Sequence, residues 1–108
     1  MLSSSLRPPN FDRYHQLKRT CQIILADCLE RGKPEIHCQA GDTDADLLCR
    51  EGWFVEQTSL IGGARDLVIP NDRWNRLIAM RGEILTPFMI EEIGRYRATR
   101  PNLFRRPF

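Results

Sequence analysis

The sequence lacks any apolar segment long enough to enter a membrane. Uncharged apolar runs reach only four residues, as in residues 23–26, whereas a membrane-spanning helix needs about 20. The first ten residues, MLSSSLRPPN, lack the apolar stretch of a secretory signal. No internal repeat is found at any period. These absences predict a cytoplasmic protein with no membrane partner.

The cysteines lack the spacing of a zinc or redox motif. Cys21, Cys28, Cys38 and Cys49 are separated by six, nine and ten residues, which fits no such pattern. Cys21 and Cys28 lie seven positions apart on one face of an expected helix, as small buried apolar residues do. We therefore expect free structural thiols, with no metal and no cofactor. Metal ligation and a disulfide are the alternatives.

The composition is that of a folded protein rather than a disordered one. The chain has 108 residues, of which 42% are hydrophobic and 28% charged, so it can bury a core without metal or disulfide support. We expect a flexible leader at residues 1–9, a single globular domain at 10–100 and a basic, aromatic tail at 101–108.

The stretch from Gly52 to Pro70 predicts a β-hairpin at about residues 53–69. Two runs rich in β-branched, aromatic and aliphatic residues flank Gly62-Gly63, and glycine adopts the positive φ angles of two-residue hairpin turns. Neither face of the first run is cleanly polar, so we expect both faces to be partly covered. Pro70 should end the second strand, because it has no N–H to donate.

Helical periodicity surrounds the hairpin. From an N-cap at Asn10, apolar residues recur every three or four positions until Gly32, and Pro34 prevents continuation. Residues 35–39 suit a short strand. A second helix opens at residues 42–46, with Thr43 and Asp46 in capping-box spacing, and stops at Gly52.

Two more helical segments follow the hairpin. Asn71 or Asp72 caps the first, which holds Trp74, Leu77 and Ile78 and is interrupted at Gly82. Thr86-Pro87 begins the last, which runs to about Thr99. Its inward-facing residues are expected to be Phe88, Met89, Ile93 and Tyr96. The order predicts an α+β fold, with a small, mainly antiparallel sheet built on the hairpin and packed by three or four helices.

Conventional catalytic motifs are incomplete. Asp42, Asp44 and Asp46 resemble the start of a calcium loop, but Leu47 occupies its glycine position and Trp53 its final acidic position. Acids at the positive end of a helix dipole explain them better. His37 and Cys38 are adjacent on an expected strand and so point to opposite faces, and His15 pairs with neither by any local pattern. These side chains favour a structural role.

Residues 48–69 resemble the first half of a PD-(D/E)xK nuclease core. In both, a helix ends in a glycine-aromatic pair, here Gly52-Trp53, a hairpin follows, and an aspartate begins the apolar run of the second strand. The resemblance implies that Asp66 is a metal-binding aspartate. It also requires an acid and a lysine on the next strand; residues 77–81 are nearest, with Ala79 at the acidic position. A degenerate nuclease-like domain is therefore one alternative function.

Charge is segregated along the chain. Residues 1–41 carry six basic and four acidic side chains (+2), residues 42–71 two and six (−4), and residues 72–108 eight and four (+4). From Ile93 onward there are five arginines and no acid. Such asymmetry is typical of a chain that binds a charged partner.

The C-terminal segment is the predicted binding region, since arginine and aromatic residues dominate interface hot spots. We expect a small non-enzymatic adaptor, inhibitor or regulator that docks a protein partner there, with the acidic 42–46 edge as a second candidate contact. Nucleic-acid binding by the same region is an alternative, as is a solvated helix end, and the opposed charges would also permit a homodimer. The candidate residues are Arg95, Tyr96, Arg97, Arg100, Phe104, Arg105 and Arg106.

Overall fold

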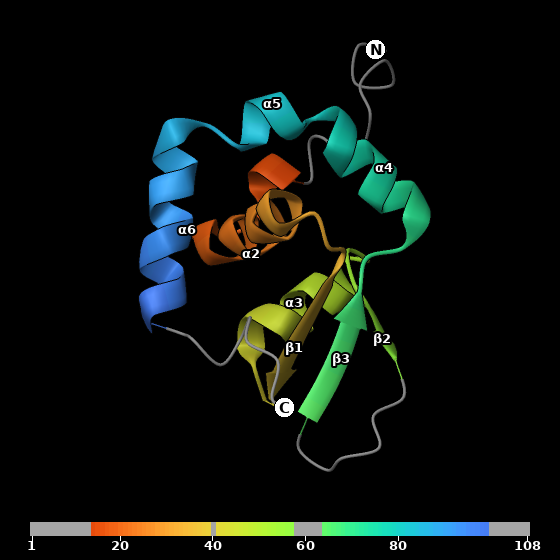
Figure 1. Cartoon of the computed structure of the whole chain (residues 1–108). Helices are drawn as coiled ribbons and strands as arrows, with labels where there is room; N and C mark the ends of the chain where they lie inside the picture. The colour runs from red at the N-terminus through yellow and green to blue at the C-terminus, as the bar shows by residue number, and fades with distance from the viewer. Residues whose placement is uncertain (1–13, 40, 58–63, 100–108) are drawn as a thin grey trace.

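A computed structural model describes residues 14–39, 41–57 and 64–99 (Figure 1). The expected leader, the Gly62-Gly63 turn and the expected tail lie outside these ranges. The fold is the α+β class that the sequence predicts. Its elements in chain order are α2 (Arg19–Arg31), β1 (Glu35–Gln39), α3 (Thr43–Arg50), β2 (Val55–Gln57), β3 (Ala64–Val68), α4 (Asn71–Ala79), α5 (Arg81–Ile84) and α6 (Pro87–Thr99).

The sheet is antiparallel, with β3 between β1 and β2. The predicted hairpin strands do pair, but Gln57 lies opposite Asp66. A two-residue turn at 62–63 would instead have placed Gln57 opposite Val68. This difference of two residues leaves every side chain on its expected face, because side chains alternate with a period of two. β3 ends at Val68, before Pro70 as predicted.

β2 is shorter and more exposed than predicted. All three of its residues are exposed, so the expectation that both faces of this run would be partly covered is wrong for β2. Trp53 and Phe54 precede the strand and are fully buried instead. The backbone N–H groups of both residues are bound to the Leu48 carbonyl at the end of α3, which turns their large side chains into the core.

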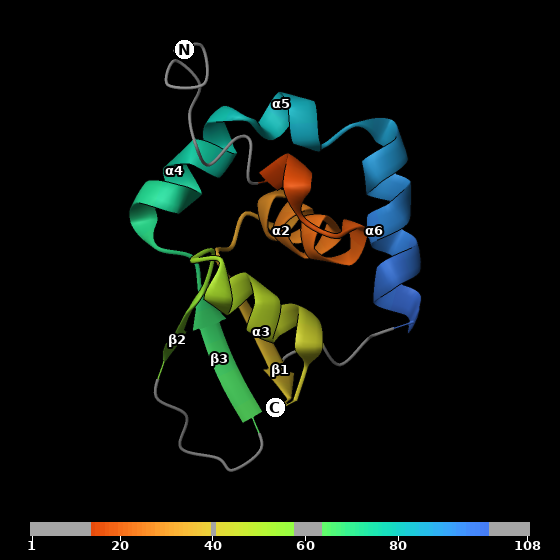
Figure 2. The same cartoon turned by 180° about the vertical axis from the view of Figure 1, so that it is seen from behind.

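Helix α3 covers one face of the sheet. Ile36 and Cys38 of β1 are buried on that face, opposite Leu67 and Arg65 of β3. Arg65 reaches across to Asp46 of α3, with 2.6 Å between Nη1 and Oδ1. Figure 1 shows the sheet in front of α3, and Figure 2 shows the reverse. In neither view does a helix of the described chain cover the other face.

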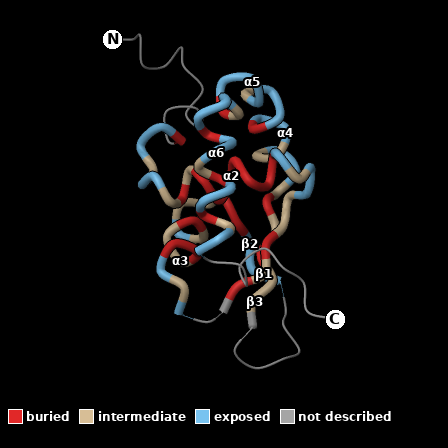
Figure 3. Tube along the Cα trace, turned by 60° about the vertical axis from the view of Figure 1, so that its left-hand side comes forward, coloured by how far each residue is buried: buried red, intermediate tan, exposed pale blue. Residues whose placement is uncertain are grey.

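Helix α2 forms the centre of the core. It packs against both α6 and α3, and the burial map in Figure 3 shows it largely inaccessible, while α4 and α5 are largely exposed. A helix that is apolar on most sides is expected to be enclosed in this way. Its buried residues are Cys21, Ile23, Ile24, Leu25, Ala26, Asp27, Cys28 and Leu29.

The first helix does not continue unbroken to Gly32. Residues 14–16 are helical, the chain then bends, and α2 begins at Arg19. Lys18 has the non-helical ψ of 155°. The Gln22 amide group donates hydrogen bonds to the carbonyls of Tyr14, His15 and Leu17 at 3.1 to 3.3 Å. These bonds satisfy the carbonyls that a helix end leaves free, which stabilises the bend. The predicted cap Asn10 lies outside the described residues.

Several helix ends follow the predicted chemistry. Gly32 ends α2 with a φ of 74°, a left-handed conformation that glycine adopts at little cost. The Thr86 hydroxyl accepts a hydrogen bond from the Met89 N–H at 3.1 Å at the start of α6. The cap of α3 is Asp42 rather than Thr43, because the Asp42 carboxylate accepts from the Ala45 N–H at 3.0 Å.

The α4–α5 region differs from prediction. Neither Asn71 nor Asp72 caps α4; both lie within the helix, which follows Pro70 without a side-chain cap. The interruption falls at Met80, and Gly82 is helical within α5. Of the apolar residues of α4, Leu77 is buried and Ile78 is 47% exposed.

Candidate functional site

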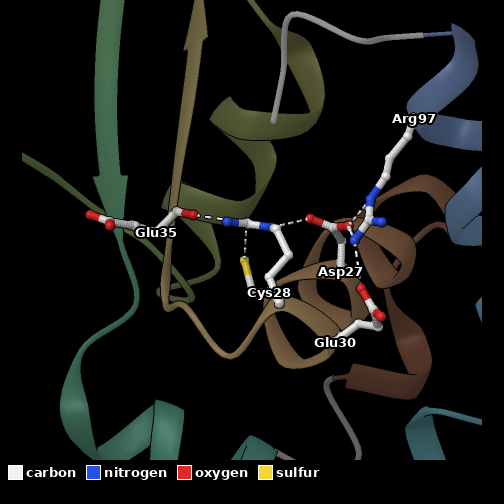
Figure 4. Close-up of polar contacts among 6 residues, drawn as sticks. Asp27, Cys28, Glu30, Glu35 and Arg97 are labelled. Atoms are coloured by element: carbon white, nitrogen blue, oxygen red, sulfur yellow. Dashed lines mark hydrogen bonds and ion pairs between the residues drawn. The ribbon is translucent and has the colours of Figure 1, made fainter. Parts of the chain in front are cut away.

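An ionic network around the buried carboxylate of Asp27 joins the inner face of α6 to α2 (Figure 4). Asp27 of α2 is fully buried. Its Oδ1 atom accepts from Arg97 Nε of α6, and its Oδ2 atom accepts from Arg31 Nε, both at 2.6 Å. Arg97 also binds Glu30 at 2.7 Å. The two acids and two guanidinium groups balance in charge, as a buried carboxylate requires.

This network also reaches the sheet. Arg31 Nη2 donates to the backbone carbonyl of Glu35 at the start of β1, at 2.9 Å. Burial on its own would lower the pKa of the Arg97 guanidinium, but its hydrogen bonds to Glu30 and Asp27 outweigh that effect and raise it. Arg97 therefore remains charged and joins α6 to α2, while Arg31 joins α2 to β1. The network is structural support.

The structure separates the predicted binding residues. Tyr96 faces the core and is only 9% exposed, and Arg97 belongs to the Asp27 network. Arg95 is exposed, and within the described parts of the chain its side chain has no ion-pair partner. Figures 1 and 2 both show α6 at the outside of the molecule. The remaining candidates lie outside the described residues: Arg100, Phe104, Arg105 and Arg106.

A shallow groove runs between α2 and α6. Its volume is about 210 Å³, below the roughly 300–1,000 Å³ of typical small-molecule sites. It therefore suits one side chain of a partner better than a cofactor. Ile23 and Tyr96 supply its apolar floor. The complete lining is Ile23, Glu92, Arg95, Tyr96 and Thr99.

The charge of this groove is set by Arg95. Glu92 is already paired with Arg19 of α2, with 2.7 Å between Oε1 and Nε. The Arg19 guanidinium also lies over the Phe88 ring, 5.7 Å from its centroid. Because Glu92 is neutralised by Arg19, no acid of the groove lining balances the positive charge of Arg95. Phe88, predicted to face inward, is 59% exposed beside this groove.

His37 and Asp66 form a pair on the sheet face opposite α3. They are directly opposite each other on β1 and β3, with 2.5 Å between Nδ1 and Oδ1. This is how an acid orients a catalytic base, but the other ring nitrogen, Nε2, is inaccessible to solvent and has no hydrogen-bond partner among the described residues. Cys38 is the next residue on β1 and faces α3, as predicted. The pair thus lacks an adjacent nucleophile.

The nuclease resemblance finds little support around Asp66. Residues 77–81, where the resemblance needs a third strand, are helical or belong to the α4–α5 junction. Within the described residues, no group of three or more histidine, cysteine or acidic side chains could hold a metal ion. Asp66 has His37 as its partner instead.

The acidic 42–46 edge is largely used by the fold. Asp42 caps α3, and Asp46 binds Arg65. Asp44 is buried and pairs with Lys18 at 3.0 Å. This arrangement agrees with the prediction of acids at a helix N-terminus and leaves little of the edge for a partner.

The described cysteines are free thiols. Cys21, Cys28 and Cys38 are buried and Cys49 is half-buried. Burial raises the pKa of the Cys28 thiol to about 12 and the pKa of Cys21 and Cys38 to about 11. A raised pKa suppresses the reactive thiolate at neutral pH, so these residues act as small apolar side chains.

The sequence reasoning missed Gln22, Asp27 and Arg31. The four-residue spacing of Asp27 and Arg31 indicates a helical ion pair, but nothing in it identifies Arg97 as the third member.

None of the described helices is long and apolar enough to cross a membrane. Comparisons with protein-family models, curated proteins and solved structures found no match to this chain.

Proposed function

We propose that the protein is a small intracellular, non-enzymatic binding protein, an adaptor, inhibitor or regulator, that docks a protein partner at the groove between α2 and α6. The observation that carries the proposal is Arg95, an exposed arginine with no ion-pair partner in the described chain, beside a groove with an apolar floor. Its free thiols fit a reducing compartment.

The groove favours a partner that presents an apolar side chain next to a carboxylate. The apolar side chain would cover Ile23 and Tyr96, and the carboxylate would pair with Arg95. Exposed Phe88, whose ring lies against the Arg19 guanidinium that pairs with Glu92, adds an aromatic surface near the groove. Arginine and aromatic side chains of this kind supply most of the binding free energy in many protein interfaces.

Nucleic-acid binding is less well supported by the described residues. A phosphate backbone is bound by several cations at once, and affinity grows with their number. Arg97 is engaged by Asp27 and Glu30, and Arg19 is engaged by Glu92. This leaves Arg95 as the unpaired arginine of the groove.

The experiment is affinity capture from the native host with three immobilised proteins: wild type, Arg95→Glu and Arg76→Glu. Arg76 is an exposed arginine on α4 and serves as the matched charge-reversal control. A partner identified by mass spectrometry is then purified, and its affinity for each protein is measured by calorimetry. We expect a loss of about tenfold or more for Arg95→Glu, since an attractive contact becomes repulsive, and little change for Arg76→Glu.

Two results would contradict the proposal. Equal affinity of the purified partner for wild type and Arg95→Glu would remove the groove as the docking site. Capture that disappears after nuclease treatment, followed by salt-sensitive binding of purified nucleic acid, would favour the nucleic-acid alternative.

A further inference from the structure

The outer face of α6 carries a regular stripe of exposed residues. Phe88, Glu91, Arg95 and Ala98 are all exposed and are spaced by three, four and three positions. This is the spacing of alternate a and d positions in a coiled coil, so the four side chains lie along one side of the helix. The inner face of α6 holds Met89, Ile93 and Tyr96, which are buried in the core. We call these four exposed residues the outer stripe.

The two charges of the outer stripe are not used within the described chain. Neither Glu91 nor Arg95 makes a side-chain hydrogen bond or ion pair with any residue in 14–39, 41–57 or 64–99. Phe88 is 59% exposed, the largest exposed fraction among the large apolar side chains of those ranges. The stripe therefore presents an aromatic ring, an acid, a base and a small residue in that order.

When two copies of the outer stripe run in opposite directions, the side chains that face each other are complementary in charge and size. Positions 88 and 98, and positions 91 and 95, are symmetric about Ile93. In an antiparallel pair of identical helices centred there, Glu91 faces the partner's Arg95, and Phe88 faces the partner's Ala98. Each acid meets a base, and each large ring meets a small side chain. A parallel pair would instead place identical charges opposite each other, which is repulsive.

We propose that a second copy of this chain docks on the outer stripe, and that the two α6 helices pack antiparallel about a two-fold axis near Ile93. A two-fold interface repeats every contact twice, so the dimer contains two Glu91–Arg95 ion pairs and two Phe88–Ala98 contacts. The apolar area is small and the ion pairs are exposed, which predicts a weak, reversible and salt-sensitive dimer.

Arg95 contributes both to the dimer and to the proposed partner-binding groove, so the two compete for that side chain. Glu91 and Ala98 do not line the α2–α6 groove, so substitutions there test self-association alone. An acid in the centre of the stripe disfavours nucleic acid or an anionic membrane surface as the occupant. Charge complementarity at mirrored positions is what favours a second copy.

The test is a charge swap measured by sedimentation equilibrium. The full-length wild-type chain is examined in low salt from about 10 µM to about 1 mM, where the account predicts a mass that rises from 12.6 kDa toward the dimer. Glu91→Arg and Arg95→Glu should each weaken self-association by at least about tenfold, because two attractive pairs become repulsive. The matched controls are Glu83→Arg on α5 and Arg76→Glu on α4, both exposed positions.

Mixing the two variants gives the decisive result. In an equimolar mixture of Glu91→Arg and Arg95→Glu, the mixed dimer pairs one basic stripe with one acidic stripe, so it should associate although neither variant does alone. The double variant Glu91→Arg/Arg95→Glu should associate like the wild type. A wild-type chain that stays monomeric to about 1 mM, variants that dimerise unchanged, or a mixture that remains monomeric would each overturn the proposal.

Discussion

Arg95 and Arg97 lie two positions apart on α6 and have opposite roles. Arg97 reaches inward to buried Asp27 and to Glu30, whereas Arg95 points outward and has no ion-pair partner in the described chain. Two positions on a helix with 3.6 residues per turn are separated by about 200°, so the two side chains leave opposite sides. The described part of the basic segment is therefore divided between a face that packs against α2 and a face that is exposed.

This division changes how the charge asymmetry of the sequence is interpreted. Five arginines without an acid after Ile93 suggest one continuous basic surface. In the structure, Arg97 is neutralised by acids of α2, 67 and 70 positions earlier in the chain. Within the described residues 93–99, the outward part is available for binding, and it has an acidic neighbour, Glu91.

The largest effect is expected at the centre of the inner network. Asp27→Ala leaves Arg31 and Arg97 without their buried carboxylate, which should lower the free energy of unfolding by about 3–5 kcal/mol. Asp46→Ala is the control, because Asp46 pairs with Arg65 at a site where 47% of the Asp46 side chain is exposed, and it should cost about 1 kcal/mol or less. Urea denaturation measures both. Similar losses would mean that the Asp27 network is no stronger than a surface pair.

Alkaline pH should weaken the core around α2 next. The pKa values of the Cys21 and Cys28 thiols rise from 9.0 to about 11 and about 12, and burial raises that of Tyr14 from 10.0 to about 12. Below pH 9 these groups hold their protons in both states and stability is unaffected. Above pH 9 the unfolded chain loses protons that the folded chain retains, so stability falls.

The expected loss is about 1 kcal/mol per buried thiol at about pH 10. Urea titrations under reducing conditions from pH 7 to about pH 10 measure it. Cys28→Ala should reduce the pH dependence, since one titrating group is gone, whatever it does to stability at pH 7. Stability that is constant up to about pH 10 would show that the thiols are not buried as described.

A smaller effect is expected where α6 begins. Thr86→Ala removes the hydroxyl that accepts from the Met89 N–H and should cost about 1 kcal/mol. Thr43→Ala is the matched control, because Thr43 is exposed and Asp42, not Thr43, caps α3. If both substitutions had the same effect on chemical denaturation, the Thr86 cap would not be the cause.

The smallest effect on stability is expected on the outer face. Phe88→Ala removes an exposed ring and its contact with Arg19, which should cost less than about 1 kcal/mol. Ile93→Ala, on the inner face, removes a buried side chain and should cost about 2–5 kcal/mol. Chemical denaturation of the two variants compares the faces directly. A large loss for Phe88→Ala would place Phe88 in the core after all.

Much of the fold follows from local patterns in the sequence. Gly32 and the Thr86 hydroxyl set helix ends by chemistry that involves only neighbouring residues, and both were predicted correctly. The strand at 35–39 and the pairing of β2 with β3 were also predicted. The bend before α2 was not, because it depends on the Gln22 side chain, which folds back onto three carbonyls and leaves no periodic signal.

The candidate site could be predicted only in part. Periodicity correctly places Met89, Ile93 and Tyr96 on the inner face of α6. It does not distinguish these residues from Phe88, which is apolar but exposed. The distinction between Arg95 and Arg97 depends on Asp27, the one acid of α2 that is fully buried. Its partners are fixed by the packing of α6 against α2, which is a tertiary contact.

The most direct test compares the thermal unfolding of Arg95→Ala and Arg97→Ala at neutral pH. Arg97→Ala removes a charged hydrogen-bond donor from buried Asp27, a loss of about 2 kcal/mol that should lower Tm by roughly 8–15 °C in a domain of this size. Arg95→Ala should leave Tm within about 2 °C of the wild type. Equal shifts, or a larger shift for Arg95→Ala, would contradict the division of α6 into a structural face and a docking face.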